Sequence, residues 1–140
     1  MESDWAFNPL DQKTYKVQFN LYEDALEAFP HGRYLHIGGD EVKTTGRDSG
    51  KSSLELQLIW LNKVCQFAEG KGRIPIFWDD MLLKQAEVYR PMFQPDRSKK
   101  EVDSIWNKNE YKLKSFLPLL PKNCIYCLLY TSDAADETCR

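Results

Sequence analysis

The sequence has no strong excess of charge of either sign and no long hydrophobic run. Its 19 basic and 21 acidic side chains give a formal net charge of -2 over 140 residues. Nothing in this balance favours a phosphate backbone, so we expect no nucleic-acid partner. No apolar stretch approaches the roughly 20 residues of a membrane-spanning helix, so we expect no membrane span. The first residues are charged and aromatic where a signal peptide would be apolar.

Histidine and cysteine are scarce, with two and four residues. Cys124 and Cys127 form a C-x-x-C pair, but a zinc site of that type needs a second pair and the sequence has none. A metal site built from His36, Asp40 and Glu41 is disfavoured because no second histidine lies nearby. We therefore expect no metal and no cofactor, and we expect His36 to be a hydrogen-bonded inner residue.

The segment 127–140 differs in character from the rest of the chain. It reads Cys-Leu-Leu-Tyr-Thr-Ser-Asp-Ala-Ala-Asp-Glu-Thr-Cys-Arg, which resembles a sequencing adapter translated in one frame. We expect 127–140 not to be native and 1–126 to form a single partial domain. An ordinary polar tail after a strand is the alternative. Without the tail, Cys65 and Cys124 remain, and two scattered cysteines are typical of small buried hydrophobic side chains.

Segments with helical spacing alternate with short apolar strands along the chain. The expected helices lie at 9–29, 53–69, 82–89 and 99–116, and the expected strands lie at 34–37, 74–78 and 124–126. Alternation of this kind predicts an α/β fold with a parallel sheet and helical crossovers. An eight-stranded β/α barrel and an open doubly wound sheet both fit the pattern.

Local signals mark where these helices begin and which face they bury. We expect Asn8 to cap the first helix, with Pro9 at its first position. Ser52 and Glu55 have the spacing of a capping box, and Ser98 suggests a similar cap. The first helix carries one apolar stripe, formed by Tyr15, Phe19, Tyr22, Leu26 and Phe29. The second carries another, formed by Leu54, Leu58, Leu61, Cys65 and Ala68.

Two adjacent carboxylates, Asp40 and Glu41, follow the first short strand and two glycines. They lie at the carboxyl end of the strand, where ligands bind in parallel α/β folds. Alternate residues of a strand share a face, so we expect His36 and Asp40 to point one way and Ile37 to face the helices. In one cavity, such a pair suits a general acid beside a charged helper. A surface pair at a strand end is the alternative.

An aromatic residue followed by carboxylates also ends the second expected strand. Trp78 can form an apolar wall of a sugar pocket by stacking on the C–H face of the ring. Asp79 and Asp80 follow it, and a core tryptophan with helix-capping aspartates is the alternative. We favour a functional Trp78 because its placement repeats that of the first motif.

A third segment, 46–52, has some features of a phosphate-binding loop. Gly46 and Gly50 are separated by three residues where the P-loop needs four. No apolar strand leads directly into the segment. We therefore expect no phosphate site there.

The string His-Ile-Gly-Gly-Asp-Glu-Val at 36–42 resembles the active-site signature of the family 20 glycoside hydrolases, the β-N-acetylhexosaminidases. The segment 5–9 is similar to the family's loop into the preceding helix. The string Phe-Trp-Asp-Asp at 77–80 resembles the next strand end, where a tryptophan lines the sugar pocket. The resemblance covers nearly all of 4–126. It implies an eight-fold β/α barrel, the TIM barrel, as the parent fold.

The resemblance also implies a retaining, substrate-assisted mechanism, in which no enzyme carboxylate becomes covalently attached. Glu41 would protonate the departing glycosidic oxygen and later deprotonate the incoming water. Asp40 would accept a hydrogen bond from the acetamide N–H of the sugar and stabilise its developing positive charge. Trp78 would enclose the acetamido group, and His36 and Asp79 would bind substrate. The implied partners are glycans that contain N-acetylglucosamine or N-acetylgalactosamine.

The chain departs from the family by holding about half of a barrel. The family's upstream sugar-binding arginine has no counterpart, and its downstream pocket residues would lie beyond Tyr126. We expect such a partial barrel to be unstable or to associate, and to be inactive or nearly so by itself. The alternative is a non-catalytic carbohydrate-binding or remnant protein. The family often works outside the cytoplasm (in the periplasm, in lysosomes or secreted), but the sequence itself specifies no compartment.

Overall fold

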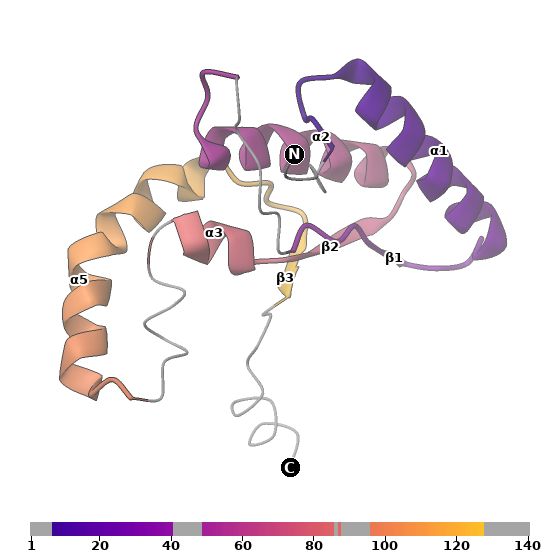
Figure 1. Cartoon of the computed structure of the whole chain (residues 1–140). Coiled ribbons are helices and arrows are strands. Elements are labelled where there is room, and N and C mark those ends of the chain that lie inside the picture. The colour runs from indigo at the N-terminus through magenta and orange to yellow at the C-terminus, as the bar shows by residue number, and fades with distance from the viewer. Residues whose placement is uncertain (1–6, 41–48, 86, 88–95, 128–140) are drawn as a thin grey trace, which may run out of the picture.

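A computed structural model of the chain describes residues 7–40, 49–85, 87 and 96–127 (Figure 1). Its helices and strands follow one another in the alternating order that the sequence predicts. In chain order they are α1 (Gln12–Ala28), β1 (Tyr34–His36), α2 (Ser53–Gly70), β2 (Ile74–Trp78), α3 (Asp80–Gln85), α5 (Lys99–Phe116), the 3-10 helix η1 (Leu117–Leu119) and β3 (Ile125–Cys127). In the described part, no helix has the length and apolar character needed to cross a membrane.

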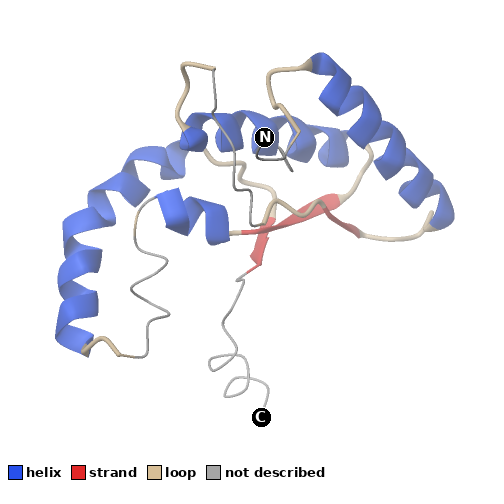
Figure 2. Ribbon diagram, viewed as in Figure 1, coloured by secondary structure: helices blue, strands red, loops and turns tan. Residues whose placement is uncertain are grey.

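The three strands form one parallel sheet in the order β1-β2-β3. His36 lies opposite Ile76 in the first pair, and Trp78 lies opposite Cys127 in the second. Helices connect the strands, as parallel pairing requires, and Figure 2 shows α2 extending along one side of them. The predicted α/β architecture with a parallel sheet and helical crossovers is confirmed.

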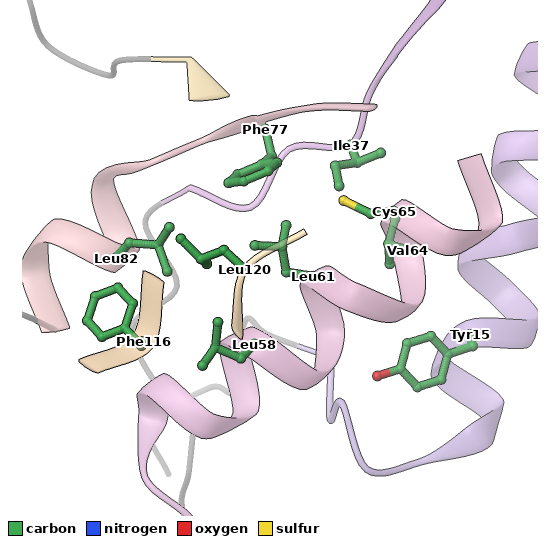
Figure 3. Close-up of a cluster of buried hydrophobic side chains, with 10 residues drawn as sticks. All are labelled: Tyr15, Ile37, Leu58, Leu61, Val64, Cys65, Phe77, Leu82, Phe116 and Leu120. Atoms are coloured by element: carbon green, nitrogen blue, oxygen red, sulfur yellow. The ribbon is translucent and has the colours of Figure 1, made fainter. Parts of the chain in front are cut away.

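One face of the sheet is covered by helices. Ile37 and Phe77 point from this face toward α2, and both are buried (Figure 3). Tyr126 lies on the same side and meets Phe77 edge to face, with ring centroids 4.6 Å apart. The other face, which we call the open face, carries the alternating residues Tyr34, His36, Ile74, Ile76, Trp78 and Ile125. None of these six is fully buried by the described residues.

The core lies between the covered face and α2. Buried residues of α2 form its centre, and Figure 3 shows Leu61 and Cys65 pointing toward the strands. Leu82 from α3 and Phe116 from the end of α5 complete the cluster. The predicted stripe on α2 is confirmed, since its five residues are all buried or packed against this cluster.

Helix α1 packs against α2, chiefly through aromatic side chains. Phe19 and Phe67 stack with ring centroids 4.2 Å apart. Two details of the predicted helix are wrong. The helix is capped by Asp11, whose side chain accepts a hydrogen bond from the Lys13 N–H, while the Asn8 side chain accepts one from Leu10 N–H in the preceding turn. Phe29 lies beyond the last helical residue and is 73% exposed, so it is not part of the buried stripe.

The caps of the other long helices match the sequence. Ser52 with Glu55, and Ser98 with Glu101, each form a reciprocal capping box at the start of α2 and α5. Helix α3 begins at Asp80, two residues before the predicted start at 82. It begins there because the carbonyl of Asp79, directly after β2, accepts hydrogen bonds from the N–H groups of Leu82 and Leu83. The predicted end of this helix, at 89, falls outside the described residues.

Strand β3 runs from Ile125 to Cys127, one residue later than the strand that the sequence predicts. The Cys127 carbonyl accepts a hydrogen bond from Asp79 N–H at 3.1 Å, which ties the end of β3 to the end of β2. Cys127 is the first residue of the segment that we expect not to be native. The rest of that segment lies outside the described residues, so the boundary at 126 stays a prediction.

Candidate active site

The chain turns sharply where β1 ends. Gly38 and Gly39 have φ angles of 78° and 98°, a region that side-chain-bearing residues rarely adopt. Asp40 follows directly and is exposed. The glycine pair therefore lets the strand deliver Asp40 to the carboxyl edge of the sheet.

Three successive carbonyl groups in this turn are each held by a different element. The Ile37 carbonyl accepts a hydrogen bond from the Tyr22 hydroxyl of α1 at 3.3 Å, and the Gly38 carbonyl accepts one from Trp78 N–H of β2 at 3.0 Å. The Gly39 carbonyl accepts one from the Gln57 side-chain amide of α2 at 3.2 Å. Burial raises the pKa of Tyr22 above its ordinary value, so its hydroxyl stays a donor at neutral pH. The turn is thereby fixed from three sides.

The indole of Trp60 lies directly against Gly39. A Cβ atom at Gly39 would lie 3.1 Å from Cζ3 of Trp60, which is closer than such atoms normally approach. Trp60 is itself held in place, because its Nε1–H donates to Oε1 of Gln18 on α1 at 3.0 Å. Glycine is thus required at position 39 for two reasons. Its positive φ angle is unfavourable for other residues, and a side chain would meet the ring of Trp60.

His36 and Trp78 lie side by side on the open face. Their ring centroids are 5.0 Å apart and the planes are inclined by 52°. Nδ1 of His36 accepts a hydrogen bond from Gly38 N–H at 3.1 Å, so we assign the proton of the neutral ring to Nε2. The expectation that His36 is hydrogen-bonded is confirmed. Its expected inner position is wrong, because the side chain is exposed.

The two aspartates after Trp78 lie at the start of α3. Asp79 is 8% exposed, and its carbonyl accepts hydrogen bonds from the N–H groups of Leu82 and Leu83. Asp80 is fully buried, and its Oδ2 lies 2.8 Å from Nζ of Lys84. Asp79 therefore lies at the N-cap of α3, which is the alternative role that the sequence indicates for it. A contact between Asp79 and the substrate stays a prediction.

Part of the predicted site lies outside the described residues. Glu41 is the central residue of this kind, and positions 46–48 of the segment 46–52 lie there too. The described end of that segment includes Ser52, which caps α2. Across the described ranges, no three histidine, cysteine, aspartate or glutamate residues are grouped closely enough to hold a metal ion.

Sequence reasoning missed Gln57 and Trp60. Both belong to α2, and both touch the turn that precedes Asp40. Gln57 lies three residues after Leu54 and four before Leu61, so it occupies a core-facing position of the helix and is only 6% exposed. A polar residue at a core-facing position was the available signal, because a buried amide must find a hydrogen-bond partner.

Comparison with protein families identifies a match over most of the chain. The family model described as "Glycosyl hydrolase family 20, catalytic domain" matches residues 1–117, which include both predicted site strings. No curated protein matches the chain.

Proposed function

The chain belongs to glycosyl hydrolase family 20, and from this premise we propose that the carboxyl edge of its sheet is the reaction centre of a β-N-acetylhexosaminidase. The family implies hydrolysis of the glycosidic bonds of hexosaminides. The finer proposal is the release of terminal N-acetylglucosamine or N-acetylgalactosamine from glycans, with retention at the anomeric carbon.

The observation that carries this proposal is the fixed turn that brings Asp40 to the same edge of the sheet as the His36–Trp78 pair. Asp40 and the two rings come from the carboxyl ends of adjacent parallel strands, the edge at which barrel enzymes bind substrates. An indole and an exposed carboxylate at one edge offer one apolar and one anionic surface. This combination suits an acetamido group, which has a methyl group and an N–H donor.

In the proposed reaction, the acetamido oxygen of the substrate attacks its own anomeric carbon. The bond from that carbon to the leaving oxygen breaks, and the leaving oxygen takes a proton from Glu41. Water then attacks the anomeric carbon of the oxazolinium intermediate, gives its proton to Glu41 and reopens the ring. Asp40 accepts a hydrogen bond from the acetamide N–H and stabilises the positive charge that develops there.

The remaining residues of the proposed site bind and orient the sugar. Trp78 packs against the acetamido methyl group. His36 offers its Nε2–H to a sugar hydroxyl, because Nδ1 is engaged by Gly38. Asp79 completes the proposed set of substrate ligands.

We also propose that residues 1–126 are part of a longer (β/α)8 barrel and that 127–140 are not native. Two features support this proposal. Among the described residues, β1 and β3 each pair on one side only. Large apolar side chains such as Tyr34 and Ile125 are also exposed on the open face. The 140-residue chain by itself is then expected to be inactive. Sequencing the source DNA across the codon of Tyr126 tests the boundary, since a genomic origin for the tail would contradict it.

The function is tested with Glu41→Gln in the enzyme translated from the intact gene. Removing a general acid costs roughly 10²–10⁴-fold in rate, and the loss should be largest for substrates with poor leaving groups. Activated aryl glycosides need little protonation and should lose less. Equal losses on both substrates would place the acid elsewhere. Glu27→Gln, the same change at an exposed site on α1, is the control and should leave both rates unchanged.

A second measurement separates catalysis from binding alone. The enzyme should hydrolyse 2-acetamido glycosides and not their 2-hydroxyl analogues, because the acetamido oxygen is the nucleophile. A protein that binds both sugars alike and hydrolyses neither would instead be a carbohydrate-binding protein.

A further inference from the structure

We propose that Gln57 and Trp60 are positioning residues that hold Asp40 in place through Gly39, and that they thereby set the selectivity of the site for the 2-acetamido group. The inference rests on the proposed function, because that function gives Asp40 its contact with the acetamide N–H. Neither residue is expected to touch the substrate.

Gln57 reaches the turn from within the protein. Its side chain is almost fully buried, and its amide nitrogen lies 3.2 Å from the Gly39 carbonyl oxygen. Burying a polar side chain is favourable only when it is hydrogen-bonded. The Gly39 carbonyl belongs to the peptide group that joins Gly39 to Asp40. The bond from Gln57 therefore fixes the orientation of this peptide plane, and with it the direction of the Asp40 side chain.

Trp60 restricts the movement of the Gly39 backbone from another side of the turn. The nearest atom of its ring lies 3.1 Å from the position that a Cβ of residue 39 would take, so the indole lies close against the backbone of Gly39. The hydrogen bond from Trp60 to Gln18 keeps the ring from moving away. The amide of Gln57 and the ring of Trp60, one turn apart on α2, therefore hold the same peptide.

The position of Asp40 is more sensitive to this support than the positions of its neighbours. His36 belongs to β1, and Trp78 is held by the sheet. Asp40 lies after two residues of positive φ, where the ladder of the sheet has ended. A displacement of about 1 Å in a catalytic group can cost about 10²-fold in rate. The amide of Gln57 is the side-chain support nearest to Asp40 among the described contacts.

The chain offers a matched control on the same helix. Asn62 also donates its side-chain amide to a backbone carbonyl outside α2, that of Leu119 at 3.0 Å. This bond joins α2 to η1, away from the turn. Asn62→Leu removes an amide-to-carbonyl bond of the same kind, and Gln57→Met removes the bond to Gly39 while keeping the length of the side chain. Gln57→Glu is a second variant, since it keeps the size and removes the donor at neutral pH.

The first experiment uses the enzyme from the intact gene and needs no activity. Hydrogen–deuterium exchange is followed in a peptide that covers residues 36–40. We expect faster exchange in Gln57→Met and Gln57→Glu than in the parent, and parent-like exchange in Asn62→Leu. Unchanged exchange in both Gln57 variants would overturn the inference, whatever the enzyme does. If Gln57→Met fails to fold, as judged by circular dichroism, Gln57→Glu decides.

The second experiment uses the enzyme from the intact gene and two readouts. One is KM against kcat for an aryl 2-acetamido glycoside. The other is the inhibition constant of a thiazoline fused to carbons 1 and 2 of the sugar, a stable mimic of the oxazolinium intermediate. We expect Gln57→Met to lower kcat by about 10- to 100-fold and to weaken thiazoline binding by a similar factor, with KM nearly unchanged.

A merely structural role for Gln57 predicts a different pattern. Fewer folded molecules lower the apparent kcat and leave the inhibition constant unchanged, which would overturn the inference. Failure of the proposed function is seen separately, as an unmodified enzyme that neither hydrolyses the glycoside nor binds the thiazoline. In that case the link to selectivity is also overturned, and the exchange experiment alone decides whether Gln57 fixes the turn.

Discussion

His36 and Trp78 contact each other across two parallel strands, with their ring centroids 5.0 Å apart on the open face of the sheet. The imidazole of His36 is also held by Gly38 N–H, so the ring cannot turn away from the indole without losing that hydrogen bond. The pair therefore forms a surface of fixed shape at the edge of the sheet that also carries Asp40.

A double-mutant cycle measures this pair. Aromatic pairs contribute about 0.5–1.5 kcal/mol beyond the area they bury, and we expect a coupling of that size between His36→Leu and Trp78→Leu in the free energy of unfolding. The pair Phe77–Tyr126, at 4.6 Å on the covered face, is the control and should show a similar coupling. Additive effects of the two Leu substitutions would show that the rings do not stabilise each other.

Gly39→Ala should destabilise the chain more than Gly72→Ala. Both glycines have positive φ, so each substitution carries the cost of a left-handed conformation, about 1–2 kcal/mol. Only the alanine at 39 also meets the ring of Trp60. Urea unfolding of both variants gives the comparison. Trp60→Phe removes the contacting atoms and should recover part of the loss at 39 and none at 72, and equal costs at the two sites would contradict the steric argument.

Asp40→Asn should lower kcat far more than it raises KM in the enzyme from the intact gene. The neutral amide keeps the size of the side chain and loses the negative charge that stabilises the developing oxazolinium cation. Removing one such electrostatic contact costs on the order of 10²–10³-fold in kcat. Steady-state kinetics on an aryl 2-acetamido glycoside tests the prediction. A large rise in KM at unchanged kcat would assign Asp40 to ground-state binding instead.

The thiol of Cys65 should make stability fall at alkaline pH. Burial, with Cys124 and Glu69 nearby, raises the pKa of Cys65 from 9.0 to about 12. The unfolded thiol therefore loses its proton first, and the free energy of unfolding decreases as pH rises from about 9 to about 12. Urea midpoints across this range measure the slope. Cys65→Ala should make the slope smaller without abolishing it, because burial still raises the pKa of Tyr22 and of Tyr126, and an identical slope would refute the assignment.

The cap of α2 should weaken in acid. Hydrogen bonds from the backbone and the side chain of Ser52 lower the pKa of Glu55 below 4.5. The contribution of the cap is therefore complete above that pH and is lost as pH falls through the folded pKa. Ser52→Ala should cost about 1 kcal/mol near neutral pH, measured by urea unfolding. Ser104→Ala, an exposed position within α5, is the control and should be neutral or slightly stabilising.

The isolated 140-residue chain should associate. Its open face exposes Tyr34 and Ile125, and the outer side of α1 exposes Val17 and Leu21. Exposed apolar surface of this kind promotes contact between copies. Light scattering after size exclusion, over a range of concentrations, measures the mass. A monomer with one cooperative unfolding transition and clear hydrolysis of an aryl N-acetylglucosaminide would contradict both this prediction and the partial-barrel proposal.

Features that depend on neighbouring residues were predictable from the sequence. The Ser52–Glu55 capping box and the buried stripe of α2 follow from spacing within a single helix, and the structure has both. The parallel sheet followed from the alternation of elements. The opposite orientations of His36 and Ile37, one exposed and the other buried, followed from the two-residue period of a strand.

Features that depend on contacts between distant segments were not predictable. The start of α1 was misplaced for a local reason, because the Asn8 side chain accepts from Leu10 N–H and the Asn8 carbonyl accepts from the Thr14 hydroxyl in the turn before the helix. The contact between Gln57 and Gly39 joins residues 18 positions apart. No local pattern encodes it, and it becomes visible only once α2 lies along the sheet.

The three carbonyl groups at 37–39 are held by a helix before the strand, a strand after it and a helix between them. All three bonds are present together only when α1, α2 and β2 have each docked on β1. We therefore expect the turn to reach its final geometry after the helices that hold it have formed. In a refolding experiment, helical content should recover before the site does.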